Sequence, residues 1–130
     1  MARHSGVCPL PAAERGASLI EFALLLPILI LLIFGMVEFG RAYNAKVTLT
    51  HATREGVRKL AITKDPAQAV MTTVDAATSL DPALISVSTT ACTSGSPTSV
   101  TATYPFSYEI PLFGSGTWSL SSTGVMRCGG

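Results

Sequence analysis

Residues 16–39 decide the fold, and they read GASLIEFALLLPILILLIFGMVEF. No charge occurs from Phe22 to Val37, and the whole stretch carries only Glu21 and Glu38. A helix that rises about 1.5 Å per residue reaches roughly 30–35 Å over this length, which is enough to cross the hydrocarbon core of a bilayer. We therefore predict a membrane-spanning helix, with a short tail before it and a head after it.

The composition leaves room for one span and one small domain. The chain has 130 residues, of which 48% are hydrophobic and only 13% are charged. Such a balance is unusual for a soluble domain unless the span is set aside. Nine Lys and Arg nearly match eight Asp and Glu, so the chain has no basic field for nucleic acid, and we exclude that class of partner.

The segment before the span, residues 1–16, is short, polar and rich in turn-forming residues. A secretory signal is one interpretation of it. However, the apolar stretch is longer than the roughly 7–15 residues of a signal-peptide core, and no small-x-small cleavage site follows it. We therefore do not expect cleavage after the apolar run.

Four stretches of the sequence resemble motifs of a known family. Residues 15–22, RGASLIEF, look like the processing site of type IV pilin precursors, with a Gly before the cut and a carboxylate five residues after it. Together with residues 21–27 (EFALLLP), 38–41 (EFGR) and 54–58 (REGVR), this segment resembles the TadE-like pilins of tight-adherence (Flp-type) pilus systems. The similarity covers about residues 14–62.

The resemblance implies a minor pilin or pseudopilin in pilus assembly, adhesion or secretion. A prepilin peptidase would remove the leader, residues 1–16, by cutting between Gly16 and Ala17 on the cytoplasmic side. Glu21 would then meet the new amino group of Ala17 on a neighbouring subunit and set the register between packed helices. The implied partners are other pilin subunits, the peptidase, the pilus assembly platform and membrane lipid. The N-terminus would be cytoplasmic and the head extracytoplasmic, with later display at the cell surface.

Two features of the span leave alternatives open. Because a carboxylate deep in a bilayer costs about 2.5–3.5 kcal/mol or more, Glu21 either has a partner or reaches back to the interface. Pro27 lacks a backbone donor, so we expect a bend near residues 23–27, with or without a function. The residues that we expect in the membrane and in the filament core are Phe22, Leu26, Pro27, Leu31 and Phe34.

At the far end of the span, Glu38 and Arg41 are three residues apart and can pair on one helix face. The distribution of Lys and Arg argues against the implied orientation, because these residues are more numerous after the span than before it. The positive-inside rule alone would place the head in the cytoplasm. The family resemblance and a cysteine pair in the head favour the opposite orientation.

The helix is expected to continue beyond the membrane, over residues 42–63. Small side chains recur there at spacings of three, four and seven residues and form a narrow seam. This seam fits either the chain's own head or sister helices in an assembly. Its members are Ala42, Ala45, Leu49, Ala52, Gly56 and Leu60.

The head, residues 64–130, is predicted to hold one short helix and a three-stranded antiparallel sheet. Asp65 and Pro66 indicate a helix start, and the apolar face of that helix continues until Asp81 and Pro82. The apolar period then changes to two, which is typical of strands. We expect strands at 85–89, 100–108 and 118–126, with turns at 94–97 and 111–116. The predicted fold class is α+β with a long transmembrane helix over residues 17–41.

The three cysteines suggest one structural bond. Cys92 and Cys128 follow the first and the third predicted strand, whereas Cys8 lies on the other side of the span. A disulfide between Cys92 and Cys128 would require an oxidising compartment, and two unpaired thiols are the alternative. With no CxxC spacing and no histidine nearby, we expect no metal.

No catalytic constellation is recognisable, and we expect neither an enzyme nor a cofactor. The head has no histidine, no Gly-rich phosphate loop and no spaced pair of carboxylates. A membrane-tethered hydrolase would need a base to activate one of the many serines. The alternative to a pilin is a permanently anchored single-pass envelope protein whose head binds a protein partner.

Overall fold

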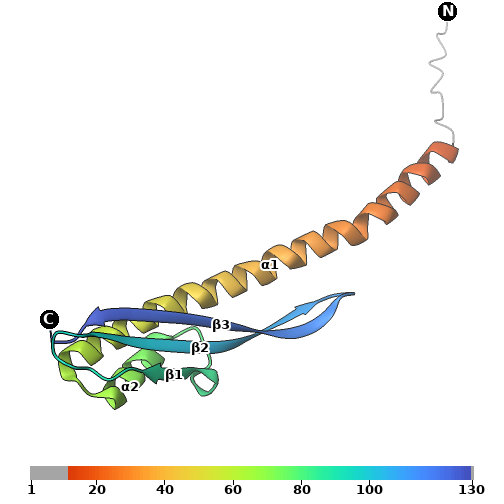
Figure 1. Cartoon of the computed structure of the whole chain (residues 1–130). Helices are drawn as coiled ribbons and strands as arrows, with labels where there is room; N and C mark the ends of the chain where they lie inside the picture. Colours follow the sequence, from red (N-terminus) through yellow and green to blue (C-terminus); the bar gives the residue numbers. More distant parts are fainter. Residues whose placement is uncertain (1–11, 130) are drawn as a thin grey trace, which may run out of the picture.

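The computed structural model describes residues 12–129, and the side chains from Gly16 onward. Most of the predicted leader, Cys8 included, lies outside the described residues. The fold is α+β, as predicted, with a long helix, a short helix and a three-stranded antiparallel sheet (Figure 1). Its elements are α1 (Ala12–Thr63), α2 (Pro66–Ala76), the short 3-10 helix η1 (Pro82–Leu84), β1 (Ser86–Thr89), β2 (Pro97–Ile110) and β3 (Gly114–Arg127).

Helix α1 is a single rod of 52 residues, about 78 Å long at the usual rise. It begins at Ala12, inside the segment that the sequence indicated as a turn-rich tail, because residues 12–15 (AAER) are strong helix formers. Pro27 lies inside the helix. Figure 1 shows a gentle curve rather than a break, so the expected bend is mild.

The junction between α1 and α2 follows the predicted signals. Lys64 has a positive φ of 57° and donates its N–H to Leu60 O, which ends α1. The Asp65 carboxylate then accepts from Ala67 N at 2.9 Å and caps α2. The end of α2 was predicted wrongly. The helix stops at Ala76 and Asp81 caps η1 instead, because an intervening turn buries Leu80.

The sheet has the order β1-β2-β3, and both pairings are antiparallel. β2 and β3 are longer than predicted, because their ladder runs without a break from Pro97↔Arg127 to Ile110↔Gly114. The predicted turn at 111–116 is therefore only the loop 111–113. β1 pairs with β2 no farther than Thr103, so beyond that residue the hairpin is a ribbon of two strands.

The core lies between the C-terminal half of α1, helix α2 and one face of the sheet. Leu49, Leu60 and Val100 are fully buried there. Two glycines allow close approach. A Cβ at Gly56 would overlap Thr73 Oγ1 of α2, and a Cβ at Gly124 would lie 2.6 Å from Thr53 O of α1. The small-residue seam therefore packs against the chain's own head.

Candidate functional site

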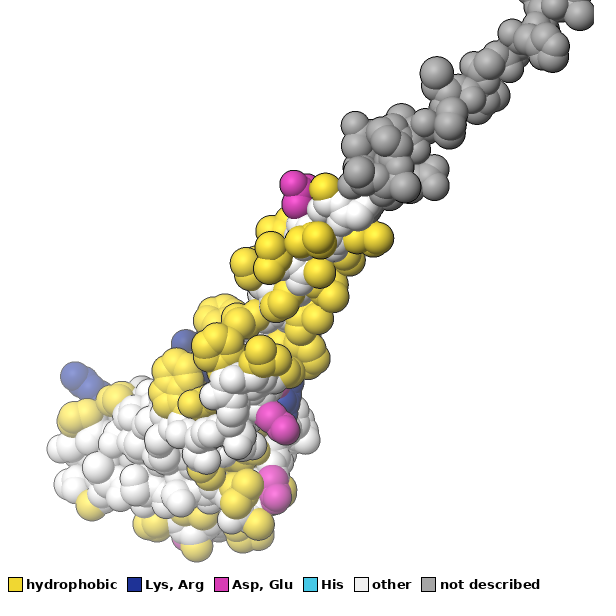
Figure 2. Space-filling view, turned by 90° about the vertical axis from the view of Figure 1, so that its right-hand side faces the viewer, with side chains coloured by type: hydrophobic (Ala, Val, Ile, Leu, Met, Phe, Trp, Pro, Cys, Tyr) yellow, Lys and Arg dark blue, Asp and Glu magenta, His cyan; other side chains and the backbone are white. Residues whose placement is uncertain are grey.

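The N-terminal half of α1 has no packing partner among the residues that the structure describes. Every Leu, Ile, Val, Phe and Met from Leu19 to Phe39 is exposed, although α1 is long and apolar enough in this half to cross a membrane. Figure 2 shows hydrophobic side chains along the visible face of the rod where it leaves the head. Isolated exposed apolar residues are normal on a protein surface, but a large continuous apolar surface indicates contact with a membrane or with a protein partner.

The predicted cleavage residues lie near the start of this exposed half. Gly16 and Ala17 are both exposed, and a Cβ at Gly16 would meet nothing within 4 Å. Packing against the described residues therefore does not require glycine at this position. Glu21 is also exposed, about one helical turn farther on.

The predicted membrane and filament residues do not share one face of the helix. Phe22 and Leu31 are nine residues apart, so they point to opposite sides of an α-helix. Their exposed fractions are 59% and 39%, and those of Leu26 and Phe34 are 39% and 42%. A helix that is apolar on every side fits lipid, or several neighbours at once, better than one groove.

Charged side chains mark the end of the apolar half that is nearest to the head. Arg41 Nη1 donates to Glu38 Oε1 at 2.8 Å, which confirms the predicted pair. Glu38 has a side chain only 13% exposed, and its Oε2 is buried without a hydrogen-bond partner. The Arg41 guanidinium also lies 5.6 Å from the centre of the Phe106 ring, so it ties the helix to β2.

The exposed half and the boundary charges fall within a segment shared with a known family. Residues 16–58 match the family model described as TadE-like protein. This segment of the chain is TadE-like. The match covers about a third of the chain and confirms the resemblance seen in the sequence. No curated protein and no solved structure matches the chain.

The TadE-like segment coincides with α1 from Gly16 to Arg58, so it includes both the exposed rod and most of the part packed on the head. TadE-like proteins are components of the tight-adherence pilus. The match therefore shows a likeness to this family over α1, between Gly16 and Arg58. The sheet lies outside the matched residues.

The two head cysteines lie beyond the TadE-like segment, at the end of the head far from the apolar half. Cys92 and Cys128 are bonded, with their Cα atoms 5.5 Å apart. Cys128 is buried, and the N–H of the next residue, Gly129, donates a hydrogen bond to Ala61 O at 3.0 Å. The end of β3 is thus held against the end of α1.

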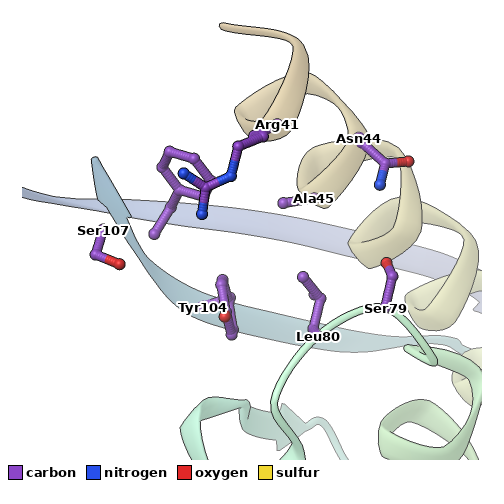
Figure 3. A pocket seen from close by; sticks show the side chains of 8 residues that line it. Arg41, Asn44, Ala45, Ser79, Leu80, Tyr104 and Ser107 are labelled. Carbon is purple, nitrogen blue, oxygen red and sulfur yellow. The ribbon is translucent and has the colours of Figure 1, made fainter. Parts of the chain in front are cut away.

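One crevice is bounded by the TadE-like helix, by the loop that follows α2, and by strand β2 (Figure 3). Arg41 is the only charged residue that lines it, and the other polar side chains there belong to Asn44, Ser79, Tyr104 and Ser107. This lining offers no histidine, carboxylate or thiol that could act as a base or a nucleophile. Within residues 12–129, no three His, Cys, Asp or Glu side chains are close enough to hold a metal ion.

Two features of the site were missed in the sequence analysis. The contact between Arg41 and Phe106 joins residues that are far apart in the sequence, and no local pattern predicts it. The other is the apolar loop 111–113, which carries two strongly exposed residues, Leu112 and Phe113. Large apolar residues at a predicted turn were a usable signal, because turns favour Gly, Asn, Asp and Ser.

Proposed function

We propose that the chain is a minor pilin or pseudopilin of a tight-adherence (Flp-type) pilus. The observation that carries this proposal is an unburied apolar rod, TadE-like in sequence, continuous with a small folded head. A soluble protein would bury such a helix. A subunit that moves from a membrane into a filament needs an apolar helix that its own head leaves uncovered. Lipid covers this helix first, and sister helices cover it afterwards.

Processing is proposed between Gly16 and Ala17 by a prepilin peptidase on the cytoplasmic side. The exposure of both residues supports it, because a protease needs access to the bond that it cuts. The cut would remove residues 1–16 and leave a new amino group on Ala17, four residues before Glu21.

Glu21 is proposed to pair with the Ala17 amino group of a neighbouring subunit. Glu21 forms no ion pair among the side chains that the structure describes. After the proposed cut it would lie about one turn from the new N-terminus of the helix, where the helix dipole favours a negative charge. In lipid or in a filament core, an unpaired carboxylate is costly, so the pairing would favour one axial offset between neighbours.

The head is proposed to lie outside the cytoplasm. Its disulfide supports this orientation, because such bonds persist in oxidising compartments and are rare in the cytosol. Assembly would then proceed through the pilus assembly platform and other pilin subunits, and lead to adhesion or secretion at the cell surface.

The intact mass of the protein extracted from its native membrane tests the proposed cut. We expect a chain that begins at Ala17, and a chain that still begins at Met1 in a strain lacking prepilin peptidase activity. A chain that keeps its leader in the presence of active peptidase would contradict the proposal. That result would favour a permanently anchored envelope protein. The N-terminus of such a protein would also be unaffected by Gly16→Ala.

The variant Glu21→Ala tests the proposed register. We expect normal membrane insertion and processing, but a severe loss of the subunit from sheared pili, because the neighbour's amino group loses its partner. Leu25→Ala is the matched control, since it truncates another exposed side chain of the same segment without touching a charge. Unchanged incorporation of Glu21→Ala would remove the proposed role.

A further inference from the structure

The tip of the β2–β3 hairpin is an apolar surface that the pilin proposal does not use. The loop between the strands consists of Pro111, Leu112 and Phe113. Leu112 is 91% exposed and Phe113 is 72% exposed, so neither side chain packs against the head. No charged residue occurs from Ile110 to Gly114.

The conformation of this loop favours a smaller residue than the one present. Phe113 N–H donates to Ile110 O at 3.1 Å and closes a turn with Pro111 and Leu112 at its centre. Leu112 has a φ of 72°, in the left-handed region that favours glycine. The chain thus places a large apolar side chain where its backbone is better suited to glycine.

The position of the tip relative to α1 points to its environment. A cleft between the helix and the hairpin is lined by Phe34 and Val37 from α1 and by Pro111 and Leu112 from the loop. Phe34 and Val37 belong to the last turn of the uncharged run that ends at Val37. The tip is therefore level with the end of the span that is nearest to the head.

The charges around this cleft are consistent with a boundary there. Glu38, Arg41 and Glu109 line the same cleft. Glu38 and Arg41 follow the apolar run of α1, and Glu109 precedes the apolar loop at the end of β2. Figure 2 shows hydrophobic surface that continues from the rod onto the adjoining end of the head. Trp118, 63% exposed, lines a neighbouring cleft with Phe39 of α1, and tryptophan is enriched at membrane interfaces.

We propose that the loop 111–113 inserts into the lipid interface on the head's side of the membrane, as a second membrane contact beside α1. This inference rests on the proposed membrane span. The depth is limited, because the ribbon beyond Thr103 has open edges whose N–H and C=O groups must stay near water or headgroups. The tip suits the interface itself, since Pro111 has no N–H and that of Phe113 is already bonded.

Tryptophan fluorescence in proteoliposomes tests the contact, because Trp118 is the only tryptophan of the chain. In the full chain with Trp118→Phe, a single tryptophan is placed at the tip by Phe113→Trp. Two matched variants carry it in the span, by Leu29→Trp, or on α2, by Met71→Trp, where the native residue is 65% exposed. Each is measured in lipids brominated either near the headgroup or near the chain end.

We expect lipids brominated near the headgroup to quench the tryptophan at position 113 strongly, and lipids brominated near the chain end to quench it weakly. The tryptophan at position 29 should be quenched by chain bromines, and that at position 71 by neither. A tryptophan at 113 that behaves like the one at 71, while position 29 is quenched, would overturn the tip contact and leave the span intact. Absence of quenching at position 29 would overturn the span itself.

A second copy of the chain is the competing occupant of the tip. In that arrangement the emission of the tryptophan at 113 would shift to shorter wavelength without quenching by bromine. The shift would also disappear when the protein is diluted with excess lipid. Either result would overturn the lipid contact, whereas quenching that persists on dilution supports it.

Discussion

The two halves of α1 are parts of one helix, but they have opposite surroundings. In the first half, every large aliphatic or aromatic side chain from Leu19 to Phe39 is exposed. In the second half, Leu49, Val57 and Leu60 are at most 2% exposed, because the head covers them. The first half is apolar all round, whereas the second half buries its apolar residues against the sheet and α2 and is mostly polar on its exposed side. The same residue type therefore stabilises the head in one half and is left for an external partner in the other.

Truncation of a leucine in each half is the strongest test of this difference. Leu60→Ala removes a fully buried side chain and should lower the free energy of unfolding of the head by about 2–5 kcal/mol. Leu25→Ala, at a site 62% exposed, should leave that stability unchanged. Urea titration of the detergent-solubilised full chain, followed by near-ultraviolet circular dichroism, measures both. Equal effects of the two variants would contradict the comparison.

Loss of the disulfide should affect only the packed half. The bond between Cys92 and Cys128 closes a loop of 36 residues, and its removal by Cys92→Ser with Cys128→Ser should cost about 3–4 kcal/mol of head stability. Retention of the chain in carbonate-washed membranes should not change, because α1 reaches the span without passing through this loop. A variant that is released from membranes would show that the head controls anchoring.

Glycines in the two halves should respond to alanine with opposite signs. At Gly56 a Cβ would overlap Thr73 Oγ1, so Gly56→Ala should cost about 1–3 kcal/mol, measured by the same titration. At Gly40 a Cβ meets nothing within 4 Å, and Gly40→Ala should stabilise the helix by about 0.5–1 kcal/mol. Destabilisation by both variants would mean that Gly40 has a partner.

The smallest expected effect concerns the cap of α2. Asp65→Ala removes the carboxylate that accepts from Ala67 N and should cost about 1 kcal/mol. Asp75→Ala is the matched control, because Asp75 is an exposed acid near the end of the same helix, where a negative charge has no favourable dipole. Thermal denaturation of the head should separate the two variants by a few degrees.

The features predicted correctly from the sequence are those with local causes. The end of α1 near Thr63, the cap by Asp65 and the pair of Glu38 with Arg41 each depend on residues at most a few positions apart. The strand positions followed from the alternation of apolar and polar residues in the sequence, and burial alternates along much of β2, although both long strands extend beyond the predicted ends.

Features that depend on distant parts of the chain could not be predicted in the same way. α2 ends at Ala76 because the following turn buries Leu80 against residues from other elements. The stacking of Arg41 on Phe106 and the level of the hairpin tip beside Phe34 require the register of β2 against α1. No periodicity in either segment specifies that register.

The absence of a loop between the two halves of α1 has a mechanical consequence. A head joined to its anchor by a flexible linker would tumble freely, and a load on it would only stretch the linker. Here one unbroken helix joins the head to the exposed apolar half, so in the proposed membrane-anchored state a force on the head is transmitted directly to the anchor. Traction on the head would tilt the anchor rather than unfold a tether.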